Sequence, residues 1–393
     1  MNRPNPYQKT IYACFIGYIV QAIVNNFVPL LFLTFQSQYS IPLSKITMLV
    51  TFNFGFQLLV DLLSAGFVDR IGYRAAAILA HVFAGTGLIL LTILPGCFTD
   101  PFVGIFLSVL VYAVGGGLLE VLISPIVEAC PTDNKEKAMS LLHSFYCWGH
   151  VGVVLLSTLF FTLFGIKNWK FIALIWAMIP LLNVLLFSRV PIASLNEGDK
   201  GLSLKELVTN KLFWIFIVLM VCSGASEQAV SQWASTFAEK GLGVSKAIGD
   251  LTGPMMFALL MGASRAIYGR YGDKINLEKF MYFSTLLCIV SYLMIALIPH
   301  PFFGLLGCAI CGLSVGIMWP GSFSMASASI RGGGTAMFAF LALAGDLGCS
   351  GGPSLVGYIS SICGENLRIG TLAALIFPVL LLIGITLRKK ISH

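Results

Sequence analysis

Residues 102–124 read FVGIFLSVLVYAVGGGLLEVLIS, a run of twenty-three residues with one charged side chain, Glu120. A helix needs about 20 apolar residues to cross the hydrocarbon core of a bilayer. Inside that core every backbone N–H and C=O group must find a partner within the protein, and a helix supplies those partners along the segment itself. The run therefore predicts a membrane-spanning helix that carries a single acidic residue.

Eleven other apolar runs of similar length occur along the chain. Charged residues make up 10% of the 393 residues, apolar residues 57%, and the mean hydropathy is +0.89. These values predict an all-α membrane protein with twelve transmembrane helices. We expect the spans at residues 10–35, 46–67, 75–95, 102–124, 138–163, 170–187, 213–237, 247–268, 279–298, 302–327, 335–360 and 368–387.

The longest polar segment, residues 188–212, divides these spans into two sets of six. We predict an N-terminal six-helix bundle over 1–187, a cytoplasmic linker, and a C-terminal six-helix bundle over 213–393. Lys and Arg in short loops favour the cytoplasmic side of a membrane. A cytoplasmic N-terminus puts 17 of the 24 Lys and Arg residues on that side and 6 on the other, with Arg265 inside a span. This bias predicts a multi-pass protein of the cell membrane with both termini in the cytoplasm.

Several other classes of protein are disfavoured by the sequence. The net charge of +7 follows from the loop asymmetry and does not indicate a nucleic-acid partner. The first 9 residues are too polar and too rich in Pro for a signal peptide, so we expect the first apolar run to be retained. Cys308 and Cys311 have CxxC spacing without a second ligand pair nearby, which favours packing residues over a metal site. The chain has no nucleophile-elbow or phosphate-cradling motif and only short loops, so we expect neither an enzyme nor a cofactor.

The two halves of the chain carry related motifs. Asp69-Arg70 follows the second span, and Asp273-Lys274 follows the eighth; Asp61 and Arg265 each lie eight residues before these pairs. The separation of the two motifs is 204 residues, and a similar separation of 196 residues joins His150 to Asp346, each between two nearby glycines. Two six-helix repeats are typical of transporters that bind a solute between their halves near the midplane.

The loop after the second span, Gly66-x-x-Asp69-Arg70-x-Gly72-x-Arg74, resembles the cytoplasmic signature of the major facilitator superfamily. The resemblance implies the fold of that superfamily, with two pseudo-symmetric six-helix bundles. Acidic and basic side chains beside helix ends can pair with partners and with helix dipoles. We therefore expect a conformational clamp that restrains the rocking of the halves. Its expected members are Gly66, Asp69, Arg70, Gly72, Arg74, Asp61, Arg265, Asp273 and Lys274.

Motifs in other spans resemble the fucose permease group of sugar–proton symporters. They are Gly115-Gly116-Gly117 before Glu120 and Ser124-Pro125, the stretch Leu142-His143-Ser144-Phe145-Tyr146, Glu227 with Trp233, Trp319-Pro320, and Gly351-Gly352-Pro353. The resemblance implies proton-coupled transport of a monosaccharide. That group carries an Asp four residues before a Pro in its first helix, whereas this chain has Asn25 before Pro29. A relay of two acids therefore does not carry over, and the coupling ion stays open.

Charged side chains within the spans need a reason to be there, because each costs from ~3 to over ~10 kcal/mol at the bilayer centre. We expect them to face a cavity, a partner or the other half. Helical spacing groups them with amides: Asn53, Gln57 and Asp61 are four apart and share one face, as do Gln21 and Asn25.

Glu120 is the first candidate for the proton carrier, because a buried carboxyl can load and release a proton. Glu227, His150 and Asp346 are further candidates, with permanent helix-packing hydrogen bonds as the alternative. A sugar needs amide and carboxylate partners for its hydroxyls and an aromatic face for its ring. The residues that offer these groups are Gln21, Asn25, Asn26, Glu120, His143, Phe145, Tyr146, Glu227, Gln228, Trp233, Trp319 and Asp346.

The leading hypothesis is a secondary transporter that moves a monosaccharide or similar small polar solute with protons and works as a monomer. The alternative is a proton-coupled antiporter that exports drugs or amphiphilic compounds. Drug antiporters of the superfamily commonly have a Gly-Pro-Gly-Gly type motif in the fifth helix and an Arg in the fourth. Here residues 149–158 contain no Pro and residues 102–124 no Arg, which weakens the alternative. A membrane receptor or scaffold that transports nothing also stays open.

Overall fold

The computed structural model describes residues 6–131, 135–193, 202, 204–330 and 333–391. Within these ranges the chain is helical and contains no strand, and twelve helical segments are long and apolar enough to cross a membrane. The all-α fold with twelve spans that the sequence predicts is confirmed. The spans are Gln8–Tyr39, Leu43–Ser64, Tyr73–Gly96, Pro101–Ala129, Leu141–Phe164, Ile166–Phe187, Lys211–Gly241, Lys246–Tyr271, Leu277–Leu297, Pro301–Ser329, Ala336–Ile362 and Leu367–Lys390.

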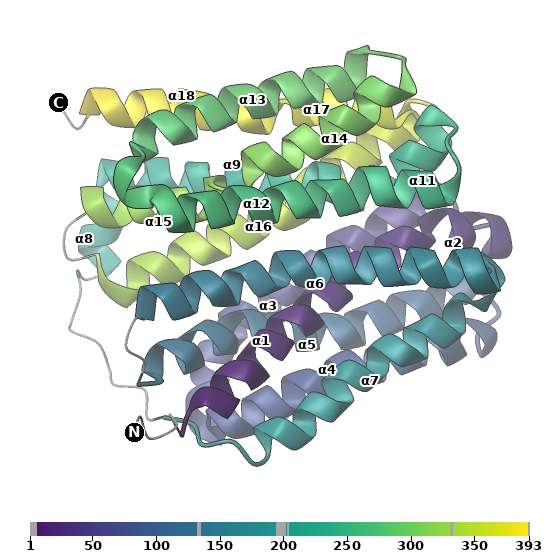
Figure 1. Ribbon diagram of the computed structural model, residues 1–393, viewed down its shortest axis with the longest axis horizontal. Helices are drawn as coiled ribbons and strands as arrows, with labels where there is room; N and C mark the ends of the chain where they lie inside the picture. Colours follow the sequence, from purple (N-terminus) through teal and green to yellow (C-terminus); the bar gives the residue numbers. More distant parts are fainter. Residues whose placement is uncertain (1–5, 132–134, 194–201, 203, 331–332, 392–393) are drawn as a thin grey trace. The chain divides into compact units, whose positions relative to one another are not determined.

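The chain divides into two compact units, Met1–Asn196 (unit 1) and Glu197–His393 (unit 2). In each unit the long helices lie alongside one another as a bundle (Figure 1). Unit 1 contains α1 (Gln8–Asn26), η1 (Val28–Leu31), α2 (Phe32–Tyr39), α3 (Leu43–Ile71), α4 (Tyr73–Ile93), η2 (Leu94–Gly96), α5 (Pro101–Ala129), α6 (Lys135–Phe164), η3 (Ile166–Asn168) and α7 (Trp169–Phe187).

Unit 2 has a short first helix and several interrupted spans. Its elements are α8 (Leu204–Thr209), α9 (Lys211–Ser231), α10 (Ala234–Thr236), η4 (Phe237–Gly241), α11 (Lys246–Asp250), η5 (Leu251–Met255), α12 (Met256–Tyr271), η6 (Gly272–Lys274), α13 (Leu277–Leu297), α14 (Pro301–Val315), α15 (Met318–Ser329), α16 (Gly334–Ile362), α17 (Leu367–Ala374) and α18 (Ile376–Ile391).

In unit 1 the glycine run before Glu120 sets how closely α5 approaches its neighbours. A Cβ on Gly115 would lie 2.5 Å from the Ala80 carbonyl oxygen of α4, and a Cβ on Gly117 would lie 2.8 Å from the Gln57 carbonyl oxygen of α3. Neither distance leaves room for a side chain. The run therefore seats α5 directly on α3 and α4, and it holds Glu120, about one helical turn further along, beside the polar stripe of α3.

In unit 2 the closest packing is between α9 and α16. A Cβ on Gly348 would lie 2.0 Å from the Val221 carbonyl oxygen, and a Cβ on Gly224 would lie 2.2 Å from the Gly345 carbonyl oxygen. Small residues that let backbones meet in this way are typical of helix pairs in membranes. The contact fixes α9, which carries Glu227, against α16, which carries Asp346.

Proline explains two of the interruptions. Pro has no N–H, so it cannot donate to the carbonyl four residues earlier. In the first span α1 ends at Asn26 and a 3₁₀ turn, η1, contains Pro29. In the eighth span Pro254 lies within the π-helical turn η5. A π turn takes its N–H from the fifth residue along rather than the fourth, so it accommodates a proline at the fourth.

Candidate solute and proton sites

Unit 1 gathers polar side chains from α1, α3 and α5 within its spans. Gln21 Nε2 donates to Glu120 Oε2 at 2.6 Å and to Gln57 Oε1 at 3.3 Å. Gln57 Nε2 in turn donates to Asn25 Oδ1 at 2.8 Å and to Asn53 Oδ1 at 3.1 Å. We name these four residues, Gln21, Gln57, Asn25 and Asn53, the amide chain. Its hydrogen bonds lead from the Glu120 carboxylate through Gln21 and Gln57 to the two asparagines.

The amide chain is buried, and no member exposes more than 5% of its surface. Both hydrogens of the Gln21 amide are engaged, whereas Gln21 Oε1 is buried and has no hydrogen-bond partner among the described residues. An amide oxygen left in this way costs about 1–3 kcal/mol. Most buried polar groups in proteins are paired, so this atom marks a place where unit 1 can still accept a hydrogen bond.

Residues of α6 border the same region of α1. Tyr146 OH accepts from Asn26 Nδ2 at 3.4 Å, and the Asn26 amide also donates to the Ala22 carbonyl at 3.0 Å. Phe145 stacks on Phe15 with ring centroids 4.4 Å apart. These predicted residues of the fifth span therefore lie against the helix that carries Gln21.

Tyr18 and Ser124 complete the contacts between α1 and α5 near Glu120. Their hydroxyl oxygens share a hydrogen bond of 2.9 Å, and the exposed His143 packs its ring edge-on to Tyr18 at 5.4 Å. His150 is buried on α6 at 2% exposure, and Glu120 is half-buried.

Unit 2 holds the carboxylate of Glu227, which is buried, and its partner is a cation. Arg265 Nη2 donates to Glu227 Oε2 at 3.3 Å, and the side chains are 16% and 10% exposed. Gln228 Nε2 donates to Glu227 Oε1 at 3.1 Å, and Gln232 Nε2 donates to Gln228 Oε1 at 3.0 Å. Glu227 thus combines an ion pair with an amide partner, both within unit 2.

The position of Arg265 follows from a proline. Pro320 cannot donate to the Gly316 carbonyl, which lies four residues earlier where α14 gives way to α15. Arg265 Nε donates to that carbonyl at 3.2 Å. The guanidinium therefore satisfies a carbonyl that the proline leaves without its helical donor, and the same contact orients it toward Glu227.

The remaining candidates of unit 2 lie on α16 and its neighbours. Trp233 is 2% exposed, and its Nε1 donates to the Pro353 carbonyl at 2.9 Å. Trp319 is half-buried and packs so closely on Gly345 that a Cβ there would lie 2.2 Å from the ring. Asp346, the next residue of α16, is half-buried. The two tryptophans thus contact different parts of α16.

Most predicted clamp residues lie at the ends of spans. The side chains of Gly66, Asp69 and Asp273 fall outside the described residues, so the structure says nothing of their contacts. Arg74 Nη1 donates to the Phe187 carbonyl at 2.8 Å, which ties the start of α4 to the end of α7. Gly72 has φ +84°, a backbone conformation that favours glycine.

The other clamp candidates are distributed between exposed ends and the interior. Arg70 and Lys274 are exposed, and Asp61 is half-buried on α3. Arg265 contacts Glu227, so the structure joins it to a predicted proton and solute residue of the same unit.

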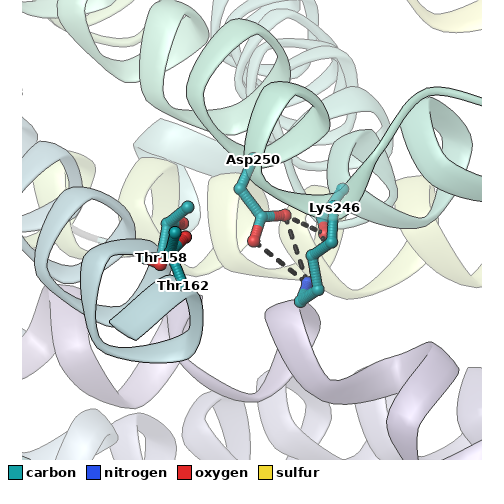
Figure 2. Close-up of polar contacts among 5 residues, drawn as sticks. Thr158, Thr162, Lys246 and Asp250 are labelled. Carbon is teal, nitrogen blue, oxygen red and sulfur yellow. Dashed lines mark hydrogen bonds and ion pairs between the residues drawn. The ribbon is translucent and has the colours of Figure 1, made fainter. Parts of the chain in front are cut away.

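Among the described residues of the spans, the buried acid Asp250 is absent from the sequence-based candidates. Asp250 is 1% exposed; its Oδ1 accepts from Ser235 Oγ at 2.5 Å, and its Oδ2 lies 3.0 Å from Lys246 Nζ (Figure 2). Lys246 and Asp250 both lie on α11, and the hydrogen bond from Ser235 fastens α11 to α10. The i, i+4 spacing of Lys246 and Asp250 was a possible signal, but at the expected end of a span it reads as an ordinary loop charge.

A second missed cluster lies in unit 1, where His81 is fully buried. Asn183 Nδ2 donates to His81 Nε2 at 2.8 Å and to the Ala13 carbonyl at 3.0 Å, and His81 Nδ1 contacts the Ala77 carbonyl at 2.7 Å. Asn183 Oδ1 is buried without a partner among the described residues. The cluster joins α1, α4 and α7, and a lone histidine in an apolar run gave no sequence signal for it.

In the part of the chain that the structure describes, twelve apolar spans with acids, amides and an arginine inside them define a multi-pass membrane protein. A sequence model of the Major Facilitator Superfamily matches residues 13–353, and the chain belongs to this superfamily of membrane transporters. No curated protein sequence matches the chain.

Solved structures of two superfamily members resemble this chain in fold. A bacterial homologue of the human lysosomal transporter Spinster, inward-facing and occupied, has a TM-score of 0.78 at 14% identity, with 99% of this chain and 98% of that chain covered. The fucose:proton symporter FucP of E. coli has a TM-score of 0.67 at 16% identity, with 97% and 99% covered. At these identities the likeness shows the fold alone.

Proposed function

We propose that this protein is a secondary active transporter that carries a monosaccharide or similar small polar solute together with protons. It works by alternating access in the cell membrane, with both termini in the cytoplasm. The observation that carries the proposal is the contact of 2.6 Å between Gln21 and Glu120, inside the spans of unit 1 and at the head of the amide chain. At this contact a carboxyl group that can take up a proton is hydrogen-bonded to amides that can also bind the hydroxyls of a solute.

The chemistry of unit 1 supports a neutral, hydroxyl-bearing solute. Amides both donate and accept hydrogen bonds, as hydroxyls do. The amide chain supplies Gln21, Asn25, Gln57 and Asn53, and the aromatic residues of α6 supply ring faces of the kind that pack on sugar C–H surfaces. The similarity of fold to a fucose:proton symporter agrees with this choice.

Unit 2 supplies the second set of proposed solute contacts. Gln228, on α9, and Gln232, the residue after that helix, form an amide ladder that ends at Glu227. Trp233 follows the ladder, with its indole N–H held by the Pro353 carbonyl. We assign Glu227 to solute binding and to the ion pair with Arg265, and we assign Glu120 as the carrier of the proton.

The test is gradient-driven uptake by the purified protein in liposomes. A panel of radiolabelled L-fucose, D-glucose, D-galactose and D-mannitol is offered with the lumen more alkaline than the medium. We expect at least one of them to accumulate, and a protonophore to abolish the accumulation. The proposal fails if none accumulates, or if accumulation is indifferent to the protonophore.

A further inference from the structure

We propose that Gln21 relays the protonation of Glu120 to the amide chain by reversing its own amide group. Gln21 is then a positioning residue that makes proton binding and solute binding favour the same state. This inference rests on the proposed function, because it concerns how the proton and the solute of that site are coupled.

The starting state follows from the donors and acceptors. An ionised carboxylate only accepts hydrogen bonds, and a glutamine amide has two hydrogens to donate and an oxygen to accept. Gln21 gives one hydrogen to Glu120 and the other to Gln57, and its Oε1 stays without a partner among the described residues. Gln21 in this orientation therefore matches an ionised Glu120.

Protonation changes the hydrogen-bonding role of Glu120 toward Gln21. A carboxyl that gains a proton from the water on one side of the membrane becomes a donor through its new O–H. When the proton is taken up on Oε2, the oxygen that lies 2.6 Å from the Gln21 NH2, the new O–H faces that NH2, and two donors do not bond. A proton on Oε1 would leave Oε2 as an acceptor, so the relay requires uptake on Oε2. Rotation of the Gln21 amide by half a turn brings its unpartnered oxygen to the new O–H. When the proton leaves to the other side, the amide turns back.

The reversal must pass along the amide chain. With its oxygen turned inward, Gln21 no longer donates to Gln57 Oε1, and the two oxygens repel each other. In the observed state Gln57 donates its two hydrogens to Asn25 and Asn53, at 2.8 and 3.1 Å, and Asn53 Nδ2 also donates to Asn25 Oδ1 at 3.3 Å. After the reversal Gln57 turns its NH2 toward Gln21 and its oxygen toward the two asparagines. Both asparagines must then turn to donate to the Gln57 oxygen, so each changes from acceptor to donor toward Gln57.

The reversed state also needs a new acceptor. The Gln21 NH2 now points to the position that its oxygen held, and a buried N–H without an acceptor is costly. A solute hydroxyl can accept there, because a hydroxyl has lone pairs as well as a hydrogen. The proton and the solute therefore stabilise the reversed state together, as a symporter requires.

Other titratable or charged groups lie on the helices that pack against α1 and α5. They are Lys9, Tyr12, Cys14, Tyr18, Lys45, Asp61, Arg70, Tyr73, Arg74, His81, Tyr112, Glu128, His143, Tyr146, Cys147, His150 and Lys170. Lys45 pairs with Asp100 and His81 with Asn183. The test therefore includes Asp61→Asn, His143→Gln and His150→Gln, to identify any pH dependence that arises from those groups.

The experiment measures apparent solute affinity against pH in detergent, with the panel sugar that gives the largest rise in melting temperature as the probe. In the wild type we expect affinity to increase as the pH falls, by up to about tenfold per pH unit, the limit for one linked proton. Gln21→Met keeps the length and removes the amide; we expect it to bind the sugar more weakly, with a pH profile that is flat to within about twofold. Gln57→Met, which interrupts the chain one step further on, should flatten the profile as well.

Asn183→Leu is the matched control. Asn183 is also buried in unit 1 at 1% exposure and also has an amide oxygen without a partner among the described residues, but its amide contacts His81 and a backbone carbonyl rather than a carboxyl. We expect a lower melting temperature with the wild-type pH profile. If Asn183→Leu also flattens the profile, the effect is one of packing and the relay is wrong.

Two results separate the relay from the function on which it rests. A wild type that binds the sugar with pH dependence, beside a Gln21→Met variant with the same dependence, overturns the relay and leaves sugar–proton transport standing. The same holds if the dependence disappears in Asp61→Asn, His143→Gln or His150→Gln while Gln21→Met keeps it. A wild type that binds and transports no sugar of the panel overturns both.

Discussion

Each unit carries a glutamate within its spans, the half-buried Glu120 in unit 1 and the buried Glu227 in unit 2, and the partners of the two acids differ in kind. Glu120 accepts from the neutral amide of Gln21, whereas Glu227 accepts from the guanidinium of Arg265 as well as from Gln228. A proton on Glu227 would leave a cation inside the spans without its counter-ion, which is expensive. A proton on Glu120 leaves no charge without a counter-ion, and in the proposed relay it requires only that the Gln21 amide rotates. In the proposed function this difference favours Glu120 as the proton carrier and Glu227 as the residue that holds a fixed arrangement.

The largest expected effect is that of Glu120→Gln on accumulation. A difference of two pH units sustains about a hundredfold accumulation when one proton moves with each solute. Glutamine cannot carry the proton, so we expect the ratio of internal to external sugar to fall to about one, while exchange of labelled for unlabelled sugar partly survives. Uptake into liposomes with and without the gradient measures both.

Glu227→Gln is the companion variant in unit 2. We expect it to weaken sugar binding but to keep accumulation that depends on the gradient, because Glu120 is intact. Gradient-driven uptake that survives in Glu120→Gln, or that disappears in Glu227→Gln with binding intact, would reverse the assignment of the two acids.

The second effect concerns stability and belongs to unit 2. Removing one partner of a buried ion pair leaves the other uncompensated and costs about 3 kcal/mol. Arg265→Gln also removes the donor to the Gly316 carbonyl, so we expect it to lower the melting temperature more than Glu227→Gln does. The double variant should recover part of the loss. Strict additivity of the two single changes would contradict the pairing.

The third effect compares two glycines of one helix. A Cβ on Gly348 would meet the Val221 carbonyl oxygen at 2.0 Å, whereas nothing lies within 4 Å of a Cβ on Gly351. We expect Gly348→Ala to cost about 1–3 kcal/mol through the separation of α9 and α16. Gly351→Ala should be neutral or stabilise by up to about 1 kcal/mol, since Ala is the better helix former. Equal melting temperatures for the two variants would disprove the close contact.

The smallest effect is at an exposed end of unit 1. Lys45 Nζ donates to Asp100 Oδ2 at 2.6 Å, and this hydrogen bond, with that from the Phe102 N–H, lowers the pKa of Asp100 below its ordinary value. The resulting stabilisation is present above the unfolded pKa and is lost as the pH falls through the folded pKa. Asp100→Asn keeps a side-chain oxygen for the helix cap. We therefore expect Asp100→Asn to lower the melting temperature only slightly at neutral pH. Added salt should screen the ion pair in the wild type and so remove the difference between the two proteins. A large fall would mean that the ion pair contributes more than an exposed contact should.

Much of the fold could be predicted because a bilayer imposes a length and an apolar composition on each span. The run 102–124 lies within the observed span Pro101–Ala129, and its acid and glycines were recognisable by eye. The i, i+4 spacing of Asn53 and Gln57, and of Gln21 and Asn25, also indicated shared faces. Faces follow from the helical repeat, which is a local property of the sequence.

The pairings between helices could not be predicted, since they depend on how far each helix slides and turns against the next. Arg265 was grouped with Asp61 by its place before a loop motif, yet it contacts Glu227 on another helix of its own unit. Asp250 was missed because its i, i+4 spacing from Lys246 lies at the expected end of a span, where it resembles an ordinary loop charge. His81 was missed because a single polar residue in an apolar run carries no spacing to interpret. Only their neighbours, Ser235 and Lys246 for the one and Asn183 for the other, make them visible.

The π-helical turn at Leu251–Met255 has a consequence for the rotational phase of the helix that follows it. Such a turn contains one residue more than an α-helical turn, and each residue advances an α-helix by about 100°. Without the additional residue α12 would present a different side to α9, and Arg265 would point about a quarter of a circle away from Glu227. The π-helical turn thus sets the direction in which α12 presents its side chains. The ion pair between Arg265 and Glu227 depends on this turn, although the turn ends ten residues before Arg265.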